Sequence, residues 1–326
     1  MYLTQRGGIS FPDNVNRTNI RQDTALFDFQ VNGFGGVDFQ SPGLNLAQMR
    51  QAVAALQHHR MTAILFTLIT DSIDSLCRKL ERIEALRRQD ERIATTVCGY
   101  HLEGPWISPE PGYHGAHPVD LICRPSLTDY RGLRDAAGGN LKLITLAPEI
   151  EGCISIVEAA SRDEVRIGLG HTNASEEAID AAIRAGATLG THVGNAVPLH
   201  LHRHDNVIQR LLARDELIAC LIPDGIHLPP FVLKNFFQAK PMGGVFFTTD
   251  SMAAAGAPPG VYSIGPHTVE VGEDGIVRLP GETRFAGSSL TLDRGVENIV
   301  NWLSIDQETA VEMCSTLPAR HFGIEL

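Results

Sequence analysis

The chain has 326 residues, of which 43% are hydrophobic, and its formal net charge is −11. This length fits one large α/β domain with an additional piece better than two equal domains, since α/β barrels commonly run to about 250 residues as one unit. The acidic balance argues against a nucleic-acid-binding protein, which needs a basic face to meet phosphates. We therefore expect no nucleic-acid partner, while a local basic pocket for one anionic ligand is compatible with this charge.

The chain shows no sign of a membrane segment or of a disulfide framework. No stretch approaches the roughly 20 apolar residues that a spanning helix needs, and residues 1–23 carry three arginines without an apolar core, unlike a secretory signal. The six cysteines are scattered and form no Cys-x-x-Cys pair, which is typical of reduced, buried thiols and not of a zinc site. These features predict a cytoplasmic protein with no membrane partner.

Short apolar runs recur along the chain and suit strands that are buried on both faces of a parallel sheet. The eight runs are Ala25–Val31, Thr62–Ile69, Thr95–Leu102, Leu141–Leu146, Val165–Gly170, Ala187–Val193, Leu217–Ile222 and Val245–Thr249. Amphipathic stretches typical of helices accompany them, at Leu46–His58, Ile73–Arg88, Arg131–Ala137, Ile154–Ser161, Ser175–Ala185, Asn206–Arg214, Pro229–Gln238, Leu290–Leu303 and Gln307–His321. This alternation predicts a closed (β/α)₈ barrel of the TIM type.

One insertion interrupts the alternation after the eighth run. The stretches Val261–Ile264, Thr268–Val271 and Ile276–Leu279 alternate like small antiparallel strands, and Asp274-Gly275 is a hairpin-turn signal. We therefore expect an N-terminal extension over residues 1–24 and a barrel domain over residues 25–326, with a small β-hairpin insertion at residues 256–285.

Carboxylates and imidazoles gather at the predicted carboxyl ends of the strands, where such barrels carry their catalytic residues. Glu103 follows the third run, His171 the fifth, His192 the sixth and Asp250 the eighth. One carboxylate oxygen and two imidazole nitrogens leave a position open for water, which is the arrangement of a catalytic metal site. Asp250 can then act as base toward that water. The alternative for each histidine taken alone is a structural hydrogen bond.

The same strand ends carry motifs that resemble those of the N-acetylglucosamine-6-phosphate deacetylases, a family of amidohydrolases. The matching segments, in family order, are residues 28–39 (DFQVNGFGGVDF), 101–106 (HLEGPW), 115–118 (GAHP), 170–174 (GHTNA), 186–188 (GAT), 191–192 (TH), 195–196 (NA), 224–227 (DGIH), 249–256 (TDSMAAAG), 286–288 (AGS) and 293–294 (DR). So many ordered segments make the resemblance specific.

The resemblance implies roles for the residues around the metal. The implied metal ligands are Glu103, His171 and His192. Asp250 is implied to be the general base and then the general acid toward the departing amine. Gln30 and Asn32 stand where binuclear relatives have a His-x-His pair, so we expect a single divalent ion, zinc or iron.

The resemblance also implies how substrate is held. His117 would contact the acetyl carbonyl region. Asn195, Ala196 and His227 would hold the sugar phosphate, and Arg203 matches an arginine that is contributed across a homodimer.

Two departures from the family pattern stand out. The family has a small β-sandwich built from N-terminal residues and a C-terminal segment, and here the first predicted strand begins near residue 25, so we expect this domain to be largely missing. Family members usually read His-Arg-Glu-Pro-Gly where this chain has residues 202–206 (HRHDN). Asp205, two residues from Arg203, can neutralise that arginine as an internal partner.

The sequence therefore predicts metal-dependent hydrolytic deacetylation of an N-acetyl amino-sugar 6-phosphate. One alternative is an amidohydrolase that acts on another N-acyl substrate, including an unphosphorylated one. The other is a non-catalytic paralogue that binds sugar phosphates.

Overall fold

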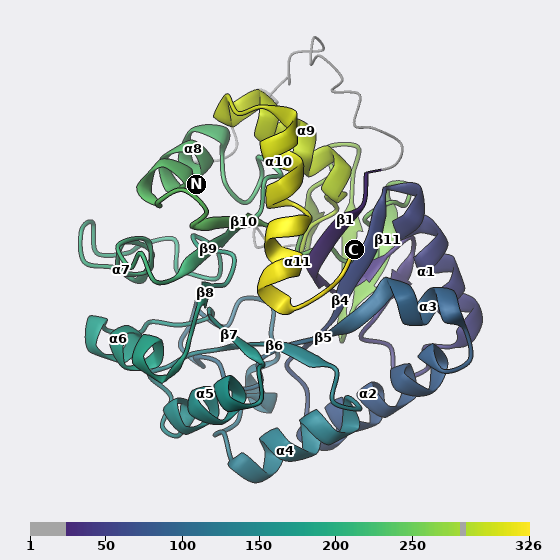
Figure 1. The fold of residues 1–326 in the computed structure, drawn as a ribbon, viewed down its shortest axis with the longest axis horizontal. Helices are drawn as coiled ribbons and strands as arrows, with labels where there is room; N and C mark the ends of the chain where they lie inside the picture. Colours follow the sequence, from purple (N-terminus) through teal and green to yellow (C-terminus); the bar gives the residue numbers. More distant parts are fainter. Residues whose placement is uncertain (1–23, 281–284) are drawn as a thin grey trace.

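The computed structural model describes residues 24–280 and 285–326, and its main sheet has eight parallel strands in the order β1-β4-β5-β6-β7-β8-β9-β10. The strands are Leu26–Val31 (β1), Met61–Ile69 (β4), Val97–Glu103 (β5), Leu141–Leu146 (β6), Arg166–Leu169 (β7), Leu189–Gly190 (β8), Ile218–Leu221 (β9) and Val245–Phe247 (β10). Figure 1 shows them in the centre of the molecule with the helices around them. The predicted TIM-type barrel is confirmed.

The two outer strands of this sheet, β1 and β10, meet beyond their regular pairing. An isolated parallel bridge joins Val31 to Ser251, and the Asn32 backbone N–H donates to the Ser251 carbonyl at 2.7 Å. The Asp28 carboxylate, on β1, accepts hydrogen bonds from the hydroxyl groups of Thr248 and Thr249, which follow β10. These contacts close the ring at the end of the strands where the site residues lie.

Eleven α-helices are described. They are Leu46–His58 (α1), Ile73–Arg87 (α2), Glu91–Thr96 (α3), Leu127–Ala136 (α4), Cys153–Arg162 (α5), Glu176–Ala185 (α6), Val207–Leu212 (α7), Pro230–Ala239 (α8), Leu292–Leu303 (α9), Gln307–Met313 (α10) and Thr316–Phe322 (α11). Side chains cap most of their N-termini, and Asn45 and Gln48 form a complete capping box on α1.

The structure corrects two predicted elements and adds one. The predicted helix Gln307–His321 is two helices, because Pro318 has no N–H and its ring would clash with the Cys314 carbonyl in a continuous helix. The predicted strand Ala187–Val193 shrinks to β8, since the chain turns sharply at His192. Helix α3 was not predicted; Asp90 caps it and draws residues 95–96 out of the predicted strand.

One hydrophobic layer lies outside the ring of strands, and another lies inside it. The larger lies between the sheet and the surrounding helices, and the smaller fills the inside of the barrel with residues such as Phe27, Phe29 and Phe246. Helix α11 closes this inner layer, because its Phe322 ring packs 5.9 Å from Phe27 and 5.5 Å from Phe29. The end of the barrel opposite the polar strand ends is therefore sealed.

The predicted insertion forms a three-stranded antiparallel sheet, with strands Gly260–Ile264 (β11), His267–Val271 (β12) and Val277–Arg278 (β13). A short hairpin of Gly33–Phe34 (β2) and Val37–Asp38 (β3) follows β1. Besides the barrel, the described residues contain these two small sheets and no β-sandwich domain. The division at residue 24 and the insertion bounds 256–285 stay predictions, because residues 1–23 and 281–284 lie outside the described residues.

The six cysteines are free, as expected, but only Cys153, Cys220 and Cys314 are buried and the other three are half-buried. No helix in the described part of the chain combines the length and the apolar character that crossing a membrane requires.

Because Asp28 is buried, we expect the free energy of unfolding to depend on pH. Burial raises its pKa from 3.8 to about 6, although hydrogen bonds from Thr248 and Thr249 oppose the rise. The folded state therefore binds this proton more tightly than the unfolded state, and the stabilisation is present below pH 3.8 and lost as the pH rises through about 6. Between pH 4 and pH 7, the free energy of unfolding of the wild type should fall by about 2 kcal/mol relative to Asp28→Asn. Urea titrations of both metal-free proteins at the two pH values measure this, and parallel pH dependence in the two proteins would contradict it.

Candidate metal centre and active site

Residues that follow the barrel strands adopt unusual backbone conformations. Among the described residues, seven other than glycine have positive φ, and four of them are predicted site residues: His171 (53°), His192 (28°), Ala196 (49°) and Asp250 (49°). Such strain concentrates at functional sites, where the surrounding structure holds it in place. The turns after β7, β8 and β10 thus hold their polar side chains in fixed positions.

Glu103, His171 and His192 converge on one point. Glu103 Oε1 lies 3.2 Å from His171 Nε2 and 3.0 Å from His192 Nε2, and the two nitrogens lie 3.1 Å apart. All three residues are buried, and they form the one group of potential metal ligands found in the described chain. Burial alone raises the pKa of Glu103, but hydrogen bonds and charge from His171 and His192 outweigh it and hold the pKa well below the usual value. The carboxylate is therefore ionised.

The contacts of His171 test whether a cation fits here. Its Nδ1 lies 3.0 Å from the Tyr113 carbonyl, which only accepts, so Nδ1 carries the proton and a neutral ring turns a lone pair on Nε2 toward Glu103 and His192. A tetrahedral ion with bonds of about 2.1 Å places neighbouring ligand atoms about 3.4 Å apart, within a few tenths of an ångström of the three observed separations. The donor set fits a divalent cation, and the hydrogen bond to Tyr113 is the kind that orients a histidine ligand.

Gln30 and Asn32 each direct a side-chain amide at a carboxylate of the candidate site. Gln30 Nε2 donates to Glu103 Oε1 at 2.9 Å, and Asn32 Nδ2 donates to Asp250 Oδ1 at 2.7 Å. Both amides are buried and orient a carboxylate. Both side chains direct N–H donors at these oxygens. A second metal ion would need lone pairs there, which a pair of imidazoles would supply and these amide nitrogens do not.

Asp250 lies next to the metal centre. Burial raises its pKa to about 7, and the negative charge of Glu103 adds to the rise, while His192, His227 and the Asn32 hydrogen bond act against it. A carboxyl group with a pKa near neutrality can both take and return a proton.

His117 stands on the other side of Glu103. Its Nε2 lies 3.8 Å from Glu103 Oε2, the oxygen that the other histidines leave free, and its ring packs edge-on against His171 at 4.4 Å. Its Nδ1 lies 2.7 Å from Thr70 Oγ1. Burial, first of all, holds the pKa of His117 well below the usual value, so the ring is neutral.

The remaining predicted residues lie around this centre at different depths. Asn195 Nδ2 donates to the His192 carbonyl at 3.1 Å, and Asn195 and Ala196 line a small cavity with His171. His227 Nδ1 lies 2.6 Å from Asp224 Oδ2, and its ring contacts Phe285 at 5.4 Å. Burial lowers the pKa of His227, but the Asp224 carboxylate outweighs it and the net effect is a raised pKa.

Deacetylases from several organisms resemble this chain over most of its length. N-acetylglucosamine-6-phosphate deacetylase of Mus musculus is 32% identical over 310 residues, which cover 92% of this chain and 74% of the relative. The enzyme of that name from Bacillus subtilis is 30% identical over 301 residues, with the same two coverages. The chain belongs to the N-acetylglucosamine-6-phosphate deacetylase family.

A solved structure agrees with this assignment. The Mycobacterium smegmatis N-acetylglucosamine-6-phosphate deacetylase, solved as a mutant in complex with N-acetyl-D-glucosamine-6-phosphate, is 28% identical with a TM-score of 0.84, and the match covers 92% of this chain and 77% of that one. No protein-family model matches the chain. The chain thus spans about three quarters of the length of these deacetylases.

In the loop of residues 202–206, which departs from the deacetylase pattern, the structure corrects the predicted pairing of Asp205 with Arg203. Asp205 does not pair with Arg203; its Oδ1 accepts from Arg210 Nε at 2.8 Å, because α7 brings Arg210 back over the loop. Arg203 is exposed, and none of the described residues forms an ion pair with it. Within one chain, Arg203 is the one predicted site residue that stays on the surface.

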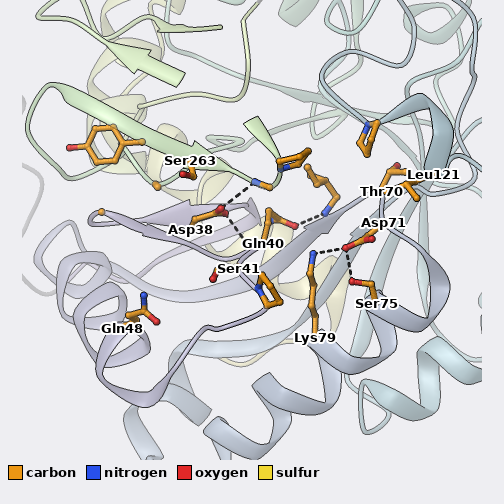
Figure 2. Close-up of a pocket in the computed structure, with 18 of the residues that line it drawn as sticks. Asp38, Gln40, Ser41, Gln48, Thr70, Asp71, Ser75, Lys79, Leu121 and Ser263 are labelled. Atoms are coloured by element: carbon orange, nitrogen blue, oxygen red, sulfur yellow. Dashed lines mark hydrogen bonds and ion pairs between the residues drawn. The ribbon is translucent and has the colours of Figure 1, made fainter. Parts of the chain in front are cut away.

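A large cavity borders the metal centre without containing it. It has a volume of ≈ 680 Å³ and lies between the β2–β3 hairpin, the start of α2 and the β11–β12 pair. Figure 2 shows Lys79 reaching to Asp71, which Ser75 also contacts, with Asp38 on the opposite wall. Thr70 and Pro118 line this cavity, and both adjoin His117.

Sequence reasoning missed two polar residues that contact the predicted site residues. Thr70 follows β4, a strand end for which no residue was singled out, and it contacts His117. Asp224 was quoted within a motif without a role, and it holds His227. The available signal for Thr70 was its position directly after a predicted strand.

Proposed function

We propose that this protein hydrolyses the acetamide of an N-acetyl amino-sugar 6-phosphate, with N-acetylglucosamine 6-phosphate as the first candidate, to the free amine and acetate. The observation that carries the proposal is the convergence of Glu103, His171 and His192 beside the half-buried Asp250, in a chain of this family.

The proposed cofactor is one divalent ion, zinc or iron, held by Glu103, His171 and His192. When bound, such an ion polarises an amide carbonyl and lowers the pKa of water toward about 7. The single-ion proposal is supported by the amides of Gln30 and Asn32, which already occupy Glu103 and Asp250 as donors.

The chain's own residues then move the proton and hold the acyl group. Asp250 takes the proton of the attacking water and delivers it to the departing nitrogen, because an amine anion is a poor leaving group. The Asn32 hydrogen bond orients the carboxylate for both transfers. His117 turns its Nε2 toward the centre and contacts the acetyl oxygen, where negative charge develops.

The sugar phosphate is proposed to lie against Asn195, Ala196 and His227, with Arg203 supplied by a second copy in a homodimer. The exposure of Arg203 and its lack of an ion-pair partner among the described residues support its use across an interface. The altered loop at residues 202–206 favours one alternative, an N-acyl substrate without a phosphate.

An acetate-release assay joined to metal analysis tests the proposal. N-acetylglucosamine, its 6-phosphate and the corresponding N-acetylgalactosamine pair should be compared at matched concentrations, with about one metal ion per chain found in the protein. Preference for a 6-phosphate supports the proposal, and equal kcat/KM with and without phosphate decides for the unphosphorylated alternative. Binding of a 6-phosphate without acetate release, in a metal-loaded protein, would identify a non-catalytic paralogue.

Arg203→Ala separates phosphate recognition from chemistry. A charge-assisted hydrogen bond contributes roughly 1.5–3 kcal/mol, so KM for the 6-phosphate should rise by more than about tenfold, while turnover of the unphosphorylated sugar stays nearly unchanged. Arg203→Lys is the matched control; it keeps the charge, loses the two-pronged geometry and should show an intermediate KM. An unchanged KM in Arg203→Ala would remove Arg203 from the site.

A further inference from the structure

Thr70 lines the 680 Å³ cavity and also contacts His117, which lies beside the candidate metal ligands. It directly follows β4 and is buried, with 2% of its surface exposed. Figure 2 shows it at the edge of the cavity beside Leu121. On the inner side, both its backbone and its side chain meet His117, so Thr70 is placed to control this histidine.

Two donors of Thr70 point at the same ring nitrogen. The Thr70 backbone N–H donates to His117 Nδ1 at 3.3 Å, and Thr70 Oγ1 lies 2.7 Å from that nitrogen. A backbone N–H cannot accept a hydrogen bond, so Nδ1 must carry the lone pair. The ring is then neutral with its proton on Nε2, and the Thr70 hydroxyl is the second donor to Nδ1.

The packing around Thr70 holds the hydroxyl in this position. Gly104 has a φ of +81°, and a Cβ built there would lie 2.2 Å from Thr70 Oγ1. The neighbouring acceptor, the Glu103 carbonyl, lies 3.5 Å away, at the limit of a hydrogen bond. The contact of the hydroxyl with His117 Nδ1 is therefore the shorter of the two. The absence of a side chain on Gly104 leaves the space that the hydroxyl occupies.

We propose that Thr70 is a positioning residue that fixes the proton of His117 on Nε2. The ring then presents its Nε2–H toward the candidate metal ligands, where Nε2 lies 3.8 Å from Glu103 Oε2. This inference rests on the proposed function, in which the Nε2–H of His117 donates to the acetyl oxygen as negative charge develops on that oxygen. The opposite tautomer would turn a lone pair toward that oxygen and repel it.

Nitrogen-15 NMR of zinc-loaded protein with labelled histidines tests the proton position without any substrate. Long-range proton–nitrogen correlations distinguish a ring nitrogen that carries a proton from one that carries a lone pair, and the His117→Gln spectrum identifies the signals of His117. We expect a lone pair on Nδ1 and the proton on Nε2. A proton on Nδ1 of the wild type overturns the proposal, and this readout needs only the His117→Gln assignment spectrum and no Thr70 variant.

Paired substitutions test the part played by the hydroxyl. Thr70→Val keeps the volume and the backbone donor but removes the hydroxyl, so kcat should fall roughly tenfold with little change in KM, and the His117 signals should shift toward a tautomer mixture. Thr70→Ser should restore kcat to within about twofold of the wild type, because it restores the donor. Unchanged kcat and unchanged His117 signals in Thr70→Val would overturn the role of the hydroxyl.

A matched control comes from the same strand. Thr67 on β4 is also buried, and its hydroxyl lies 3.3 Å from the ring of a different buried histidine, His101. Thr67→Val should leave the His117 signals in place, and movement of those signals in both valine variants would attribute them to general loosening and overturn the proposal. A wild type that releases no acetate would refute the proposed function alone, since the NMR result still decides where the proton of His117 lies.

Discussion

Replacing Asp250 by asparagine is expected to lower kcat by about 10²–10⁴-fold, the usual contribution of a positioned proton-transfer group. Asparagine has nearly the same shape and can still accept the hydrogen bond from Asn32 through its amide oxygen. It cannot take a proton from water or return one to the amine. Metal content and substrate affinity should therefore change little, and the loss should fall on kcat and kcat/KM together. Steady-state acetate release, with metal analysis of the same samples, measures this.

Asp38→Asn is the matched control for this experiment. Burial also raises the pKa of Asp38, to about 6, but its carboxylate lies in the neighbouring cavity and accepts from the backbone of Gln40 and Gly265. This variant should keep kcat within about twofold, since it removes no proton transfer. Near-normal turnover of Asp250→Asn would show that Asp250 is only a structural residue of the rim.

Replacing Glu103 by glutamine is expected to remove both the metal and the activity. The loss of an outer partner of a metal ligand already costs about 10–100-fold in affinity, and Glu103 supplies the one negative charge among the three converging atoms. An amide at this position also turns a donor or a weaker ligand toward His171 and His192. Elemental analysis after dialysis should find well below the roughly one ion per chain of the wild type.

Glu84→Gln is the control for loss of a buried carboxylate. Glu84 is buried but pairs with Arg87 and accepts from Tyr100 and Asn140, away from the metal centre. Its substitution should reduce stability and leave the metal content unchanged. Metal retained in Glu103→Gln, or lost equally in both variants, would contradict the assigned ligand set.

The sequence by itself determined the architecture and most of the metal centre. Eight apolar runs of strand length, alternating with amphipathic stretches, admit few arrangements besides a closed parallel barrel. Because the carboxyl ends of all its strands meet at one rim, residues as distant in sequence as Glu103 and His192 were predicted to converge, and their atoms lie 3.0 Å apart. Element bounds were predicted less well, as the break between Met313 and Thr316 and the shortened β8 show. Turns after strands depend on contacts with distant residues.

Only the tertiary structure decided how the polar side chains pair. The partner of Asp205 is Arg210 and not Arg203, because the direction of α7 places one arginine within reach and leaves the other exposed. The tautomer of His117 follows from Thr70, which lies 47 residues earlier in the chain. The raised pKa of Asp250 follows from its burial beside Glu103. Periodicity and motifs report which residues share a rim, whereas hydrogen-bond partners, proton positions and burial depend on separations of a few ångströms that the packed barrel sets.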